Sequence, residues 1–398
     1  MKHHFFILFI ACFSLISCQE TDTFYTITTV NDTKLKREKE TIEIQLKNLP
    51  EFSKEEYNNL SIFDTKNNLV LSQLIDIDQD SIQDYIIFQT DFNANETKKF
   101  TLTYQKEVQI NNKIDLRTFC RIVPERIDDF AWENDKVAFR TYGPKCQQLF
   151  EEGKPGGLIS SGIDCWTKKV NYPIINKWYA NHQKGVSYHE DHGEGLDAYH
   201  VGTTRGCGGI ALVNNNSYFL SENFVSWKVL ANGPIRSIFE LKYPPVVIDN
   251  MHATETKRIT LDLGSNLYHC SVSYKSENTL DTIAIGVTLH KGKGKANSNK
   301  AEGWLSYWEP YANSNLGTGV IVTPKSVSNI VLDTIIKEDE SLNNIWIHSK
   351  LIHQSASYWS GYGWQSAGDF NSAQEWENYL SKQSRLKNNS IKIQISKN

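Results

Sequence analysis

Residues 257–274 read Lys-Arg-Ile-Thr-Leu-Asp-Leu-Gly-Ser-Asn-Leu-Tyr-His-Cys-Ser-Val-Ser-Tyr. Two alternating polar and apolar runs flank the turn sequence Leu263-Gly264-Ser265-Asn266, which is typical of a β-hairpin. Further strand-length segments surround this hairpin at 225–230, 235–243 and 282–290. This regular spacing, without a long helical pattern, predicts an all-β fold built on a large antiparallel β-sandwich.

The segment before the sandwich also alternates in hydrophobicity, in four short runs separated by Asn and Asp turns. We therefore predict a small N-terminal β-domain over 27–115 and a catalytic β-sandwich over 116–398. Near the C-terminus, 372–387 is a helix candidate, in which Trp376 and Tyr379 are spaced as core contacts.

Carboxylates alternate along 76–84, which resembles the first half of a calcium-binding loop. However, Ser81 stands where the turn glycine belongs, and Ile87 replaces the acid at the twelfth position. An Asx-rich hairpin is the favoured interpretation.

The chain begins with a short basic start and a mostly apolar run that is too short to cross a bilayer as a helix. The run ends in Leu15-Ile16-Ser17-Cys18, which resembles a bacterial lipobox. The resemblance implies a lipoprotein signal peptide over 1–17, lipidation of Cys18 and a tether over 18–26. The mature protein would then be anchored by lipid in the outer membrane, on the periplasmic or the cell-surface side. Secretion with cleavage nearby is the alternative.

The composition excludes some classes of function. The formal net charge is −4, so no basic footprint points to nucleic acid. Aromatic residues make up 12% of the chain, which suits either sugar stacking or an all-β core. The five cysteines after Cys18 are far apart and form no C-x-x-C pair, so they are expected to be buried small side chains, although a disulfide stays open.

Titratable side chains are densest in 188–202, Tyr-His-Glu-Asp-His-Gly-Glu-Gly-Leu-Asp-Ala-Tyr-His-Val-Gly. The stretch fits neither a helical nor a strand period, and glycines interrupt it. Such a composition suits proton transfer or metal binding, and a solvated polar loop is the plainer alternative.

Cations and aromatic residues in other segments suit an anionic sugar, because rings stack on pyranoses and cations hold carboxylate or sulfate groups. The candidates for substrate binding are Arg140, Trp166, Lys177, Arg205, His290, Trp304, Trp308 and Glu309. A structural ion pair is the alternative role for Arg140.

Several strings between about 125 and 320 resemble a family of large β-sandwich proteins long described as of unknown function. They are Arg126-Ile-Asp-Asp-Phe-Ala-Trp-Glu-Asn-Asp, Ser161-Gly-Ile-Asp-Cys-Trp-Thr-Lys, Tyr188 to Tyr199, Arg205-Gly-Cys-Gly-Gly and Asn232-Gly-Pro-Ile-Arg. Members of that family are encoded in bacterial polysaccharide-utilisation gene clusters. One is a dehydratase acting on oligosaccharides of ulvan, a sulfated algal polymer of rhamnose and uronic acids. The resemblance implies a galactose-mutarotase-like sandwich and a carbon–oxygen lyase.

Chemistry then suggests roles for individual residues. Removing water from a terminal uronate needs a neutralised carboxylate, a base for H5 and an acid for the 4-hydroxyl. We assign proton transfer to His189 and His192, with Tyr188 or Tyr199 as partner. In the competing interpretation, His189, His192 and Asp197 hold a divalent metal ion. Two other classes stay open: a non-catalytic carbohydrate-binding lipoprotein, and a sugar epimerase or mutarotase using histidine and Glu309.

Overall fold

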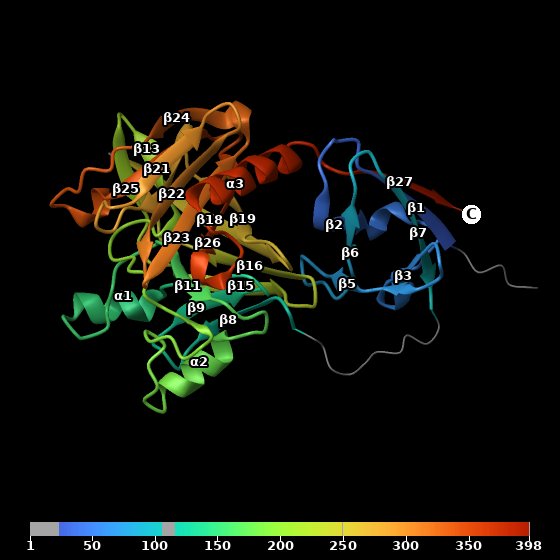
Figure 1. The fold of residues 1–398 in the computed structure, drawn as a ribbon, viewed down its shortest axis with the longest axis horizontal. Helices are drawn as coiled ribbons and strands as arrows, with labels where there is room; N and C mark the ends of the chain where they lie inside the picture. The colour runs from blue at the N-terminus through green and yellow to red at the C-terminus, as the bar shows by residue number, and fades with distance from the viewer. Residues whose placement is uncertain (1–23, 106–115, 249, 398) are drawn as a thin grey trace, which may run out of the picture.

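The computed structural model describes residues 24–105, 116–248 and 250–397. Strands dominate this part of the chain, and all pairings between its named strands are antiparallel. The prediction of an all-β sandwich is therefore confirmed. A small β-domain stands beside the sandwich, and the C-terminal strand runs into that small domain (Figure 1). The signal peptide and Cys18 lie outside the described residues.

The small domain consists of two sheets packed on one apolar core. The first sheet has the order β27-β1-β7-β3-β4, with bounds Lys392–Lys397, Phe24–Val30, Thr97–Tyr104, Leu60–Asp64 and Leu69–Val70. The second has the order β2-β6-β5, with bounds Arg37–Gln45, Tyr85–Phe92 and Ser72–Ile75. Alternation along these strands sends Ile27, Ile42 and Phe88 into the core between the sheets.

The sandwich contains three sheets. A nine-stranded sheet has the order β15-β16-β18-β19-β26-β23-β22-β21, with β17 paired to β18. Its bounds are Ser226–Ala231, Arg236–Lys242, Met251–Asp262, Leu267–Lys275, Ser355–Trp364, Ser314–Val322, Trp304–Tyr311, Lys295–Asn299 and, for β17, Val246–Ile248. The predicted hairpin of 257–274 forms β18 and β19 at its centre.

Two five-stranded sheets complete the sandwich. One has the order β12-β11-β10-β9-β8, with bounds Gly195–Leu196, Asp164–Lys168, Ala138–Thr141, Asp129–Glu133 and Phe119–Val123. The other has the order β14-β13-β20-β25-β24, with bounds Ser217–Leu220, Cys207–Asn214, Thr282–Thr288, Asn344–Lys350 and Val327–Val331. Their inner faces meet the nine-stranded sheet in one large apolar core.

Three α-helices lie in the described part of the chain: α1 (Pro144–Glu151), α2 (Ile175–His182) and α3 (Ala373–Lys387). The predicted C-terminal helix is α3, which Ser372 caps by accepting from the Glu375 N–H. Trp376 of α3 is buried against the outer face of the nine-stranded sheet. None of the described helices is long and apolar enough to cross a membrane.

The C-terminal strand differs from the expected domain boundary, which placed all of 116–398 in the sandwich. β27 pairs with β1 from Tyr25↔Lys397 to Val30↔Lys392, because Ile393 and Ile395 continue the alternating pattern of that sheet. The small domain is thus assembled from both ends of the described chain.

Two smaller predictions have clear outcomes. The cysteines at 120, 146, 165, 207 and 270 are free and buried, as expected for small core side chains. In the loop at 76–84, Asp76 accepts from the N–H groups of Gln79 and Ser81, and Gln79 and Ser81 have positive φ. Asp78 and Asp80 also form Asx turns, by accepting from the N–H groups of Asp80 and Ile82, in the loop between β5 and β6 that the hairpin interpretation predicted.

Candidate functional site

The candidate site lies on the outer face of the sheet that contains β9, β10 and β11. Phe139 of β10 points into the main core, so Ala138 and Arg140 point to the opposite face. Register then places Arg140 directly opposite Asp164 of β11. Helix α2 and the segment 187–199 cover this face, because Trp178 and Tyr188 pack there around Trp166.

A buried charge cluster forms the floor of the site. Arg140 Nε donates to Asp164 Oδ2 at 2.7 Å, and Nη2 donates to Asp197 Oδ2 at 2.8 Å. Its Nη1 lies 3.5 Å from Asp129 Oδ2. One guanidinium therefore faces three carboxylates, all of them buried. Arg140 is buried and paired with these carboxylates, which is the structural ion-pair role that the sequence left as its alternative.

Burial controls protonation in this cluster. Removal from water raises the pKa of Asp164 to about 7, helped by Asp197 and opposed by Arg140. Burial also raises the pKa of Asp129 and of Asp197, and Arg140 opposes it at both. Burial therefore favours the protonated form of these carboxylates, and the charge of Arg140 favours the ionised form.

His189 rises above this floor and is exposed. Its Nδ1 lies 2.7 Å from the backbone oxygen of Asp197. A carbonyl oxygen only accepts, so Nδ1 carries the hydrogen and Nε2 keeps a lone pair. The ring centroid lies 4.6 Å from that of Tyr188. This is the tautomer that a general base needs.

Tyr188 lies at the centre of the site and is buried, with 5% of its surface exposed. Its ring contacts Trp166 at 4.8 Å on the sheet side and His182 at 4.4 Å on the helix side. Its Oη accepts from Arg140 Nη1 at 3.4 Å. Because the phenolic oxygen accepts this hydrogen bond through a lone pair, its own hydrogen remains available for donation.

Two residues of this site were not found from the sequence: Arg126 and His182. Arg126 Nη1 donates to Asp129 Oδ1 at 2.7 Å, while 24% of its side chain stays exposed. Burial and the nearby His189 lower the pKa of His182, so that imidazole is neutral at pH 7. Arg126 opens one of the strings that carry the family resemblance, which was the available signal.

The backbone beside Arg126 is strained. Ile127 has φ +59°, in the left-handed region that a β-branched residue rarely adopts. Such conformations cost about 1–3 kcal/mol and concentrate at functional sites. The strain places Arg126 and Asp129 on the same side of the sheet, since Asp129 binds Arg126 directly.

Other predicted residues lie near this site in different roles. Trp166 is buried beneath Tyr188, so its ring faces are covered and cannot stack on a sugar. Lys177 is exposed and pairs with Glu194 at 2.6 Å. His192 directs Nε2 to the Ser187 carbonyl at 2.9 Å, away from Asp197. A hollow of about 40 Å³ lies between Trp178, Tyr188 and His192.

The proposed metal ligands His189, His192 and Asp197 are not brought together. His189 meets the Asp197 side chain only at 3.5 Å, and His192 turns elsewhere. In the described residues, the set whose ligand atoms all lie within 4.8 Å of one another is Asp76, Asp78 and Asp84, in the exposed Asx loop. The physical reason is that the glycines at 193 and 195 turn the chain between the two histidines and Asp197.

A second group of predicted residues meets where the segments after β12 and after β20 reach strand β22. His290 Nδ1 lies 2.7 Å from Glu309 Oε1, and its ring is 4.6 Å from that of Tyr199. Tyr199 Oη and His290 Nε2 are buried and have no partner in the described part of the chain. His290 also has φ +45°. The sequence named all three residues but did not predict that they touch.

The remaining candidates are structural. Arg205 is buried and donates to Ser161 Oγ and to the Thr203 carbonyl. Trp304 and Trp308 lie on the far side of the sandwich, where they pack with Trp376 beneath α3. They cannot stack on a ring held at His189. Alternation along β22 is the reason, because Glu309 faces the opposite side from Trp308.

The fold and site define an all-β sandwich protein with a polar, histidine-bearing site on one sheet. The chain belongs to the family described as "Domain of unknown function (DUF4861)", whose model matches residues 29–393. It is 38% identical over 402 residues to "Uncharacterized protein P7" of Formosa agariphila, covering 99% of this chain and 100% of that protein.

Two solved structures are similar only remotely. One is a protein in the glycosyl hydrolase family 38 from Enterococcus faecalis, with a TM-score of 0.48, 9% identity and 94% of this chain covered. The other is an alpha-mannosidase from Enterococcus faecalis V583, with a TM-score of 0.45, 9% identity and 94% of this chain covered. This chain spans 47% and 46% of their respective lengths.

Proposed function

We propose that this protein removes water from the non-reducing-end uronate of ulvan oligosaccharides, giving a 4,5-unsaturated sugar. The observation that carries the proposal is that His189 and Tyr188 lie side by side above a buried charge cluster, which Arg126 also joins through Asp129. A lone-pair base, a hydroxyl donor and a partly exposed guanidinium are the three groups that this elimination requires.

Each residue has a role in the proposed reaction. Arg126 binds the uronate carboxylate, so that negative charge can spread into it as C5 loses its hydrogen. His189 Nε2 takes H5, and the C5–H electrons form the C4–C5 double bond. The C4–O bond breaks, and Tyr188 donates its hydrogen so that the 4-hydroxyl leaves as water. The proton on His189 then returns to Tyr188 through solvent.

The cellular location of the reaction is also part of the proposal. The Cys18 lipid would anchor the protein in the outer membrane, where it meets acidic oligosaccharides on the periplasmic or cell-surface side. The strings from Arg126, Ser161 and Tyr188 support the choice of reaction, because residues from all three converge at the site.

The test is to incubate the protein with saturated ulvan oligosaccharides. We expect a rise in ultraviolet absorbance, because the new double bond is conjugated with the carboxylate, and a mass loss of one water. Retained binding without either change would instead identify a non-catalytic carbohydrate-binding lipoprotein.

His189→Gln and His192→Gln form a matched pair for the base. His189→Gln should lower kcat by about 10²–10⁴-fold, the usual contribution of a positioned base. His192→Gln should change kcat less than about threefold, because the Nε2 atom of His192 is already bonded to the Ser187 carbonyl. Equal activity of both variants would refute the assignment.

A second candidate function is favoured by the His290–Glu309 pair. Glu309 orients an imidazole whose Nε2 is free, opposite a free tyrosine hydroxyl, which suits proton transfer in an epimerase or mutarotase. Nuclear magnetic resonance of the sugar pool distinguishes this activity, because configuration or anomer ratio changes while no water is lost. His290→Gln should then abolish turnover while His189→Gln does not.

A further inference from the structure

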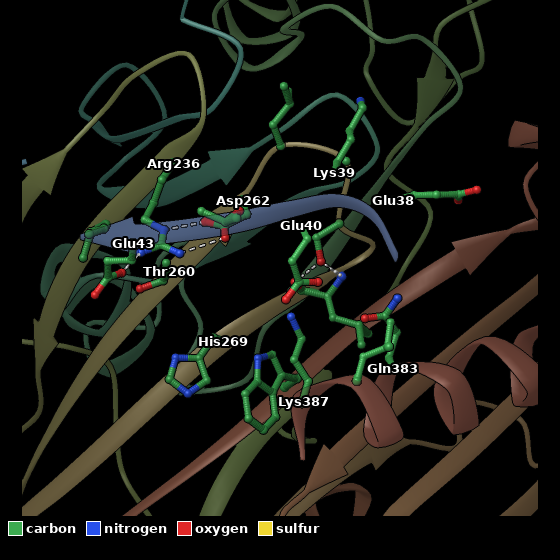
Figure 2. Close-up of a pocket in the computed structure, with 18 of the residues that line it drawn as sticks. Glu38, Lys39, Glu40, Glu43, Arg236, Thr260, Asp262, His269, Gln383 and Lys387 are labelled. Carbon is green, nitrogen blue, oxygen red and sulfur yellow. Dashed lines mark hydrogen bonds and ion pairs between the residues drawn. The ribbon is translucent and has the colours of Figure 1, made fainter. Parts of the chain in front are cut away.

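The outer face of the nine-stranded sheet carries two adjoining hollows, remote from His189. The first is a cavity of about 530 Å³ between this sheet, β2 of the small domain and the end of α3 (Figure 2). The second is a hollow of about 760 Å³ beside β24 and β25. Arg258 and Ser271 line both, so the two form one groove along the sheet.

The first hollow contains an aromatic platform. His269 of β19 and Trp359 of β26 are cross-strand neighbours, and their rings lie 4.8 Å apart. Burial, and secondarily Lys387, lower the pKa of His269 to about 4. His269 is therefore uncharged at neutral pH. Lys387 lies over the Trp359 ring at 5.9 Å, so an ammonium group and an apolar ring meet at one place.

Each carboxylate of the groove contacts a cation, although Glu43 and Asp262 share one. Glu43 and Asp262 bind Arg236, each at 2.6 Å, and Glu240 binds Arg258 at 2.7 Å. Glu38 and Glu40 pair with Lys36 and Arg37. Figure 2 shows Arg236 joined to Asp262 on one wall and Lys387 on the other.

Four of the five lysines that line the groove have no carboxylate partner among the described residues. Across residues 24–105, 116–248 and 250–397, no carboxylate pairs with Lys325, Lys350, Lys382 or Lys387. The groove thus has an excess of positive charge in a chain whose formal net charge is −4. The exposed surface of the second hollow is mainly apolar, and hydroxyl-bearing side chains lie along it: Thr256, Ser273, Thr323, Ser326, Ser349, Ser355 and Ser357.

The groove is preformed. Lys39 of the small domain pairs with Asp135 of the sandwich at 2.8 Å, and Gln89 donates to the Leu263 carbonyl at 2.9 Å. Arg37 donates to the Asn389 carbonyl at the end of α3. A binding site whose walls are fixed in advance loses less entropy when a long ligand binds.

We infer that this groove binds a chain of an acidic polysaccharide, separately from the site at His189. An aromatic platform accepts a pyranose ring, hydroxyl groups bind its substituents, and four unpaired lysines bind carboxylate or sulfate groups along the chain. Ulvan is the probe because of the proposed function, but the inferred ligand chemistry does not depend on dehydration.

The test measures the dissociation constant of polymeric ulvan for the full-length protein carrying His189→Gln. Lys325→Gln/Lys350→Gln/Lys387→Gln should weaken binding at least about tenfold, and so should Trp359→Ala. The matched control is Lys34→Gln/Lys66→Gln/Lys300→Gln, which loses the same charge outside the groove. On α3, Arg385→Gln is a second control, because Arg385 binds Glu302 away from the groove.

Chemically treated polymers show which anionic group of the polysaccharide the lysines bind. Loss of affinity after desulfation assigns the lysines to sulfate, and loss after carboxyl reduction assigns them to uronate. Full binding of both treated polymers would overturn the inference, as would equal weakening by the groove and control triples.

A final measurement separates this inference from the proposed reaction. The groove variants, made with His189 intact, should turn over short oligosaccharides at the wild-type rate. If no dehydration is found but the groove variants still lose polymer binding, the inference about the groove is supported and the proposed reaction is refuted.

Discussion

At the scale of single residues, Arg126 and Arg140 differ in burial. We expect the more exposed Arg126 to contribute mainly to activity and the buried Arg140 mainly to stability. Both contact Asp129, but Arg126 is 24% exposed and Arg140 only 6%. Arg126→Gln should lower kcat/KM by about 10²–10³-fold and the free energy of unfolding by less than about 1 kcal/mol. Activity assays and urea unfolding measure both quantities.

Arg140→Gln is the matched variant and should behave in the opposite way. It leaves buried carboxylates at 129, 164 and 197 without their cation, which should cost about 3–5 kcal/mol of stability. If Arg140→Gln were as stable as the wild type and Arg126→Gln were not, the two roles would have to be exchanged.

His269 makes stability depend on pH. Its pKa in the folded protein is lowered to about 4, whereas the unfolded chain titrates near 6.5. Above pH 6.5 His269 is uncharged in both the folded and the unfolded state, so it does not change the free energy of unfolding. As the pH falls from 6.5 towards 4, the unfolded chain binds a proton that the folded protein does not, so stability is lost.

His269→Gln should therefore be less acid-sensitive than the wild type. We expect a relative gain of up to about 3 kcal/mol at about pH 4 and none at about pH 7.5, measured by urea unfolding. Asp164 has a raised pKa, so its contribution to stability changes with pH in the opposite direction. That contribution is the same in variant and wild type and cancels when the two are compared. A constant difference at both pH values would contradict the assignment.

Residue types at the site were predictable, but their roles were not. The sequence singled out Tyr188, His189 and Asp197, and the structure brings these three together. It also singled out Trp166 and Arg140, which are buried. Local sequence cannot show whether a ring or a guanidinium faces solvent, because the covering residues come from α2, far from β10 in the chain.

At the scale of elements, β27 is the one on which the small domain depends. It covers β1, and Ile391 and Ile395 pack against the core of that domain. Deleting 391–398 should lower the stability of the small domain by about 2–4 kcal/mol, through lost apolar burial. Hydrogen exchange should show faster exchange of the β1 amides.

Lys392→Gln/Lys397→Gln is the control for this deletion. It removes only the surface pairs with Asp32 and Glu51, so the loss should stay below about 1 kcal/mol. If the hydrogen-exchange rates of the β1 amides were unchanged after the deletion, β27 would not stabilise β1.

Strands with clean alternation were the predictable elements. The hairpin at 257–274 and the helix at 372–387 were located correctly, because each has a strong period and a turn or capping residue. Helix α2 was missed, because Tyr172-Pro173 precedes it and its eight residues show no full amphipathic pattern. The pairing of β27 with β1 was also missed, since no local signal specifies a partner at the other end of a chain.

At the scale of the whole molecule, the two domains share an apolar contact. Ile75 and Ile87 of the small domain pack with Leu230, Ile235 and Ile238 of the sandwich. Gln73 adds hydrogen bonds to the Ile235 and Arg236 N–H groups. We therefore expect calorimetry to show one cooperative unfolding transition.

Ile87→Ala should split that transition in two, because it opens a cavity between the domains at a cost of about 2–5 kcal/mol. Ile27→Ala is the matched control, since Ile27 is equally buried but lies inside the small domain. It should lower the melting temperature without separating the domains. Identical scans for the two variants would refute the coupling.

The pairing of β27 with β1 also has a consequence for protein synthesis. Residues 392–397 leave the ribosome after every other described element, although they complete a sheet whose first strand, β1, is made before any of those elements. Until then a nascent chain exposes β1 as an open edge, which is a site for chaperones or for aggregation. A message cut short near its end would therefore yield a polypeptide with a finished sandwich and an unfinished small domain, a defect that cellular quality control can recognise.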